Sequence, residues 1–166
     1  MDAGILVARV VFGLLMAAHG AQKLFGWFGG YGLAGTAGFF ESLGFRPARF
    51  FAATAAGTEL VAGLLMALGL LGPVGPALFV SLMIVAAVTV HWQHGLFAQN
   101  NGIEMPLLYG VAGVALALTG PGAYSLDAAL GLTTLAAPMV AWVALATGVL
   151  GGVANLAIRR PAAAAA

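Results

Sequence analysis

The segment RVVFGLLMAAHGAQKLFGWF, residues 9–28, is apolar enough to lie in a bilayer, yet it carries Arg9, His19, Gln22 and Lys23. At about 100° per residue of α-helix, Arg9, His19 and Lys23 fall within an arc of about 80°. Ionisable groups are costly inside a membrane, and they therefore face a bundle interior or a cavity and find partners there. This segment predicts a membrane-spanning helix with one polar stripe, and further helices that supply its partners.

The composition of the whole chain indicates the same class of protein. Of its 166 residues, 62% are hydrophobic and 7% are charged, whereas a soluble domain has about 25% charged residues. Such a chain could not cover its surface with polar groups, and we expect an all-α integral membrane helical bundle. At about 20 residues per span, the length suits four or five spans in one domain.

Net charge and cysteine content exclude several functions. The net charge is +1 without a basic run, which leaves no basis for a nucleic-acid partner. The chain has no cysteine, which excludes disulfides, thiol redox chemistry and thiolate metal ligation within this chain.

Apolar runs and their breakers predict a single transmembrane domain over residues 1–160, followed by a disordered tail at 161–166. The phenylalanine-rich segment 36–45 is too short to span a bilayer, and we expect it to be a brief interfacial helix. The spans are expected at residues 4–25, 50–71, 77–92, 103–118 and 135–158.

Five spans place the two termini on opposite sides of the membrane. One side then receives most of the basic residues, namely Lys23, Arg46, Arg49, Arg159 and Arg160, and the other receives Asp2 and Asp127. Since basic residues accumulate in cytoplasmic loops, this distribution predicts an external N-terminus and a cytoplasmic C-terminus.

Six ionisable residues are candidates for an intramembrane site. A rise of about 1.5 Å per residue predicts that most of them converge on the inner half of one four-helix bundle: His19, Lys23, Glu59, His91 and Glu104. Arg9 lies nearer the outer side and is expected to reach Glu59 only through its long side chain. Each unpaired charge would cost about 2.5–3.5 kcal/mol at the centre of a span, and we expect pairing across helices.

These side chains are compatible with several chemistries. A pocket of this kind suits a quinone, whose carbonyl groups need donors such as Lys23 or His19, and whose protons would pass through Glu59 or a histidine. His19 and His91 would instead ligate a b-type haem if haem is present, although two histidines in a bundle are weak evidence. No other metal site is expected. In a third reading, the charges are structural ion pairs that fix the helix register.

Small residues at intervals of four indicate where helices pack closely. Ala53 and Gly57 form one such pair, and Ala144, Gly148 and Gly152 form a longer stripe on the fifth span. We expect this stripe to pack on the bundle or on a second protomer, which would make the protein a homo-oligomer.

Several of these segments together resemble the DoxX family of small bacterial membrane proteins. The similar segments are Arg9 in the first span, HGAQKLFG at 19–26, FGG at 28–30, FFESLGF at 39–45 and TELVAGLLMALG at 58–69. The resemblance covers about residues 5–120 and implies a four-helix core, to which the fifth span is an addition. It implies Arg9, His19, Lys23 and Glu59 as the polar signature, with His91 less firmly matched.

The resemblance also implies a redox setting in the bacterial inner membrane, since this family is related to the membrane subunit of thiosulfate:quinone oxidoreductase. We therefore expect a redox-associated subunit that contacts lipid and a partner subunit, and that binds a quinone-like or other small hydrophobic molecule. The alternative is a non-enzymatic anchor or assembly subunit whose ion pairs are structural. A further alternative is a path for protons or small solutes, which would need a continuous water-filled route from Arg9 to His91.

Overall fold

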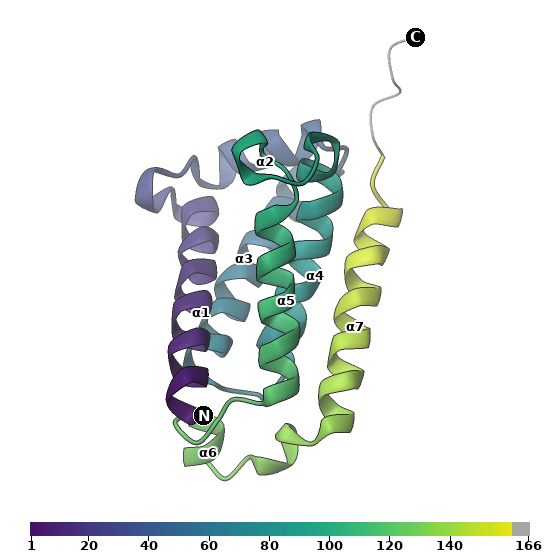
Figure 1. The fold of residues 1–166 in the computed structure, drawn as a ribbon. Coiled ribbons are helices and arrows are strands. Elements are labelled where there is room, and N and C mark those ends of the chain that lie inside the picture. Colours follow the sequence, from purple (N-terminus) through teal and green to yellow (C-terminus); the bar gives the residue numbers. More distant parts are fainter. Residues whose placement is uncertain (161–166) are drawn as a thin grey trace.

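The computed structural model describes residues 1–160, and this part of the chain is a bundle of helices without a strand (Figure 1). The prediction of a tail at 161–166 lies outside the described residues. The helices are α1 (Asp2–Phe25), α2 (Gly32–Ser42), α3 (Ala48–Leu68), α4 (Val74–Ala86), α5 (Glu104–Thr119), α6 (Leu126–Ala129) and α7 (Pro138–Ala157).

Four helical segments in residues 1–160 are long and apolar enough to cross a membrane: Asp2–Phe25, Ala48–Leu68, Val74–His94 and Pro138–Ala157. α5 is apolar but has only 16 residues, and it lies alongside the longer helices (Figure 1). The predicted all-α membrane bundle is confirmed. The five expected spans correspond to four segments of full length and one shorter helix.

Local backbone chemistry explains where the helix ends differ from the expected ones. α3 ends at Leu68 rather than at residue 71, because Gly69 adopts a left-handed conformation with φ 63°, a common way to terminate a helix. The helical run that begins with α4 continues beyond Ala86 through a π-helical turn, Ala87–His91, and a 3-10 turn, Trp92–His94. This run therefore reaches slightly past the expected end at residue 92.

Glycines allow α1 and α3 to pack against each other with almost no space between their backbones. A Cβ atom on Gly20 would lie 2.5 Å from the backbone nitrogen of Leu60. A Cβ atom on Gly63 of α3 would likewise lie 2.4 Å from the backbone nitrogen of Ala17. Small residues permit such close contact between membrane helices, and this contact sets the height at which side chains of α1 face those of α3.

α4 is the central helix of the bundle and contacts α3, α5 and α7. Phe79 of α4 is 1% exposed and packs with Met16 of α1 and Met66 of α3. These buried contacts hold α1, α3 and α4 together and position the walls of the site described below.

The small-residue stripe of the fifth span packs within the chain. A Cβ atom on Gly148 would lie 2.4 Å from the carbonyl oxygen of Ala77, and one on Gly152 would lie 3.0 Å from that of Ser81. Both partners belong to α4. The surface that was considered as a homo-oligomer interface, Ala144 with these two glycines, is therefore largely taken up by the contact between α7 and α4.

Candidate functional site

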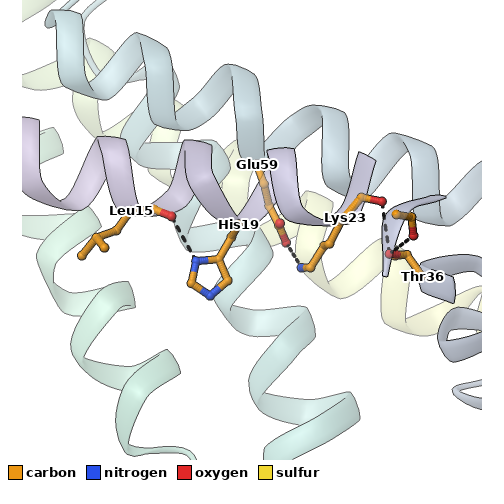
Figure 2. A network of polar contacts seen from close by, with 6 residues as sticks. Leu15, His19, Lys23, Thr36 and Glu59 are labelled. Carbon is orange, nitrogen blue, oxygen red and sulfur yellow. Dashed lines mark hydrogen bonds and ion pairs between the residues drawn. The ribbon is translucent and has the colours of Figure 1, made fainter. Parts of the chain in front are cut away.

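An ion pair joins α1 to α3 within the bundle. The ammonium group of Lys23 donates a hydrogen bond to Oε1 of Glu59 (Figure 2). Long side chains on a helix point back toward its N-terminus, which brings Lys23 from the last turn of α1 down to the middle of α3. The close α1–α3 contact at Gly20 lies less than one turn before Lys23. The glycine packing thus brings the two charged groups within reach of each other.

The two partners of this ion pair differ in exposure and in how many hydrogen bonds they make. The side chain of Glu59 is 8% exposed and that of Lys23 is 33% exposed. Within residues 1–160, no group donates a hydrogen bond to the second carboxylate oxygen of Glu59, Oε2, although it is buried. A buried polar atom without a partner costs about 1–3 kcal/mol, and more when the group is charged. Glu59 therefore has unused hydrogen-bonding capacity inside the protein.

A cavity of about 510 Å³ lies beside this pair, within the range of about 300–1,000 Å³ typical of small-molecule sites. Most of its wall is apolar, and the wall's charged side chains are Lys23 and Glu59. Four helices besides α1 supply the wall: the end of α2, one face each of α3 and α4, and one side of α7. The site is thus an apolar chamber with one ion pair in its wall.

Aromatic rings form one part of the same wall. The rings of Phe40 and Phe45 have centroids 5.4 Å apart, and those of Phe45 and Phe51 have centroids 5.5 Å apart. All three residues line the cavity, and Phe45 is 2% exposed. Aromatic rings at such spacings pack favourably with one another, and they would do so with a flat ring placed in the cavity.

Small polar side chains in the wall were not among the sequence-based candidates. They are Thr54, Thr58, Ser81, Thr89, Thr147 and Asn155. The sequence did contain a signal for them, because residues about one helical turn apart lie on the same face of a helix. Thr54 and Thr58 have this spacing, and so do the successive wall residues at 77, 81, 85 and 89 and at 144, 148, 151 and 155. Each run marks the face of a helix that lines the cavity.

His19 does not join the ion pair. It is exposed, and its Nδ1 donates a hydrogen bond to the carbonyl oxygen of Leu15, 3.0 Å away on the same helix (Figure 2). It is not among the residues that line the cavity. The 80° arc predicted for the polar stripe is broad enough that Lys23 faces α3 while His19, four residues earlier, does not.

His91 and Glu104 stabilise a loop at the end of the bundle and do not line the cavity. Nδ1 of His91 donates to the carbonyl oxygen of Asn101 at 2.8 Å. Oε2 of Glu104 accepts a hydrogen bond from the backbone nitrogen of Ala98 at 2.8 Å. Both side chains thus bind the turn between α4 and α5, which explains why they do not converge with Lys23 and Glu59 as expected.

Arg9 lies toward the opposite end of the bundle and does not reach Glu59. Its guanidinium group donates to the carbonyl oxygens of Ala67, in the last turn of α3, and of Tyr124, in the loop after α5. Arg9 is 3% exposed, and its Nε has no partner within residues 1–160. It therefore caps the C-terminal end of α3 and holds a loop, which depth estimates along a helix could not show.

The cavity would not offer imidazole ligands to a haem, because neither His19 nor His91 is in its wall. In the part of the chain that the structure describes, no three histidine, aspartate or glutamate side chains come together as metal ligands would. The side chains that are present suit a ligand held by hydrogen bonds and apolar contacts.

These features define a multi-pass helical membrane protein that has a Lys–Glu pair in the wall of a mostly apolar cavity. The family model described as DoxX matches residues 4–92, which is more than half of the 166-residue chain. The chain belongs to the DoxX family, and the resemblance found in its sequence is confirmed. Lys23 and Glu59 both lie within the matched region.

The chain is also similar to a named bacterial protein, "Putative oxidoreductase CatD" of Bacillus subtilis (strain 168). The two sequences are 32% identical over 126 residues, which is 76% of this chain and 86% of the other. No solved structure gave a significant match.

Proposed function

We propose that this protein is a redox-associated membrane subunit that binds a quinone-like or other small hydrophobic molecule in the cavity beside Lys23 and Glu59. The observation that carries the proposal is the ion pair in the wall of a mostly apolar cavity of about 510 Å³. Support for the redox setting comes from the DoxX family and from the similarity to a protein named as an oxidoreductase.

The residues of the wall suggest how such a ligand would be held. The ammonium group of Lys23 has three N–H donors, and its one hydrogen bond is to Glu59, which leaves donors for a ligand oxygen. The rings of Phe40, Phe45 and Phe51 would pack on a flat ring, and the apolar faces of α4 and α7 would contact an alkyl tail. Glu59 is the carboxylate in the wall, and it would accept a proton or a charge-assisted hydrogen bond.

A partner subunit belongs to this proposal. The chain has no cysteine, and thiolate chemistry would have to be supplied by another protein. For the membrane itself we propose the bacterial inner membrane, with the N-terminus outside. The start of α1 and the end of α7 lie at opposite ends of the bundle (Figure 1), and the basic Arg159 and Arg160 follow α7, as the positive-inside rule favours.

The test is to purify the protein in a mild detergent, record its UV–visible spectrum and analyse an organic extract by mass spectrometry. We expect a hydrophobic ring compound to copurify in stoichiometric amount with the wild type and to be lost from Glu59→Gln and Lys23→Met. The matched control is Glu41→Gln, because Glu41 is exposed on α2 and is not in the cavity wall. Equal retention by all variants would contradict the proposal.

A second function, a non-enzymatic anchor or assembly subunit, is favoured by one observation: the ion pair directly joins α1 and α3. Removing one partner of such a pair leaves the other charge without its counter-ion and weakens the contact between the helices. In this case Glu59→Gln would lower stability in detergent, and no ligand would be extracted from the wild type. The extraction experiment therefore separates the two functions.

A further inference from the structure

We infer that the cavity selects ligands whose ring carries a hydroxyl group, such as a quinol or another alkylphenol, over otherwise similar ligands that carry only a carbonyl or ether oxygen. Glu59 would accept the hydrogen bond from that hydroxyl. This inference rests on the proposed function, because it requires that the cavity binds a hydrophobic ring compound.

The hydrogen-bonding capacity of Glu59 is the basis of the selection. An ionised carboxylate accepts hydrogen bonds and cannot donate them. Oε1 is used by Lys23, and Oε2 has no donor within residues 1–160. A quinone or an ether brings only acceptors and leaves Oε2 without a partner, whereas a hydroxyl group supplies the missing donor. Hydrogen bonds to charged groups are among the stronger ones in proteins.

The other polar groups of the wall discriminate less strongly. Lys23 can donate to a hydroxyl, carbonyl or ether oxygen. The hydroxyls of Thr89 and Thr147 already donate to carbonyl oxygens of their own helices at 2.8 Å, so toward a ligand they act as acceptors, but as neutral ones, whose hydrogen bonds are weaker than those of a charged carboxylate. Among residues 1–160, Glu59 is the only carboxylate in the wall, so most of a preference for a donating ligand should depend on this residue.

Oε2 itself has less than 1 Å² of exposed surface, so the carboxylate must turn slightly to meet a ligand. The terminal torsion of a glutamate is broad and roughly two-fold, which makes this rotation easy. Glu59 already contributes to the cavity wall. A small rotation would thus present a carboxylate oxygen to the chamber while the other stays near Lys23.

The experiment compares two redox-inert probes, 4-nonylphenol and its methyl ether 4-nonylanisole, in which a methyl group replaces the hydroxyl hydrogen. Binding to the wild-type protein is measured by equilibrium dialysis in detergent, with protein-free micelles to correct for partitioning. We expect the phenol to bind roughly tenfold tighter or more. Glu59→Gln should bring the two affinities close together, because its amide can donate to the ether, and Glu41→Gln should keep the wild-type ratio.

Each outcome decides between the two proposals. If both probes bind the wild type equally, the selection for a donor is refuted while the cavity remains a ligand site. A preference that persists in Glu59→Gln refutes the role of Glu59. If neither probe binds, the proposed function fails and the selection fails with it. The wild-type comparison does not depend on any variant, and it therefore stands even if Glu59→Gln does not fold.

Discussion

The contact between α1 and α3 predicts that Gly20→Ala is strongly destabilising. The added Cβ atom would lie 2.5 Å from the backbone nitrogen of Leu60 and 2.7 Å from the carbonyl oxygen of Ala56, whereas ordinary contact begins at 3.4 Å. Both opposing atoms belong to backbone, which cannot rotate away as a side chain can. The two helices would therefore have to separate by roughly 1 Å, as an overpacked core does.

The magnitude follows from two opposing terms. Overpacking typically costs about 1–3 kcal/mol, occasionally more, and alanine is favoured over glycine in a helix by about 1 kcal/mol. Because the clash of Gly20→Ala is with backbone on two sides, we expect the overpacking cost to lie at the upper end of its range and the net loss to be about 2 kcal/mol. The control is Gly57→Ala on α3, where a Cβ atom meets nothing within 4 Å, and we expect it to be neutral or stabilising by up to about 1 kcal/mol.

The difference would be measured by unfolding both variants with SDS in mixed micelles and monitoring the change in tryptophan fluorescence. Gly20→Ala should also weaken the retention of any copurified ligand, because Lys23 lies less than one turn further along α1. If Gly20→Ala and Gly57→Ala unfold at the same SDS fraction, then α1 and α3 do not pack as closely as in the structure. In that case the glycine contact does not position the ion pair.

Two further predictions concern the end of the bundle near the N-terminus, and both are checked by the same unfolding measurement. Arg9→Met leaves two backbone carbonyls without their charged donor. It should lower the free energy of unfolding by about 3 kcal/mol or more, since each such bond is worth about 1.5–3 kcal/mol. The control Arg49→Met, at an exposed position, should change it little. Asp127→Asn should cost about 1–3 kcal/mol, because the buried carboxylate accepts from two backbone N–H groups of the α3–α4 turn at 2.9 and 2.6 Å, and an amide offers only one oxygen. Stability unchanged in either variant would refute the corresponding capping role.

Much of the fold could be predicted from the sequence because the bilayer imposes simple constraints. Apolar length, glycine and proline breakers and the low charge predicted a helical membrane bundle, and the helices α1 and α7 lie close to their expected positions. The cost of charge in lipid also singled out Lys23 and Glu59, and these two side chains do meet.

The rest of the site could not be predicted because depth along a helix does not determine direction. His19 and Lys23 share a broad stripe, yet only Lys23 is directed to Glu59. His91 and Glu104 lie at helix ends, where backbone groups of the α4–α5 loop are their hydrogen-bond partners. Charge balance predicts pairs between ionisable side chains, but it does not predict hydrogen bonds between such a side chain and nearby backbone groups.

The close packing of α1 and α3 also escaped the sequence-based reasoning. The predicted pair of small residues on α3, Ala53 and Gly57, does not form the contact, because a Cβ atom on Gly57 would meet nothing within 4 Å; Gly13 and Gly20, which do meet the backbone of α3, are seven residues apart. At about 100° per residue, a spacing of seven leaves two residues about 20° apart around the helix, closer than the about 40° of a spacing of four. The stripe that matters for the site was therefore present in the sequence, and buried Ala17, four residues after Gly13, also belongs to it.

The cavity wall combines residues inside and outside the region that matches the DoxX family. Its charged pair comes from residues 4–92, the part that matches the DoxX family, and so do its four phenylalanine rings. α7 lies outside that match, and it supplies Thr147, Asn155 and adjacent small residues to the opposite wall. A ligand group that contacts the ion pair would thus meet features of the matched region, whereas its tail would meet α7. We therefore expect relatives that differ in this last helix to bind similar ring groups with different tails.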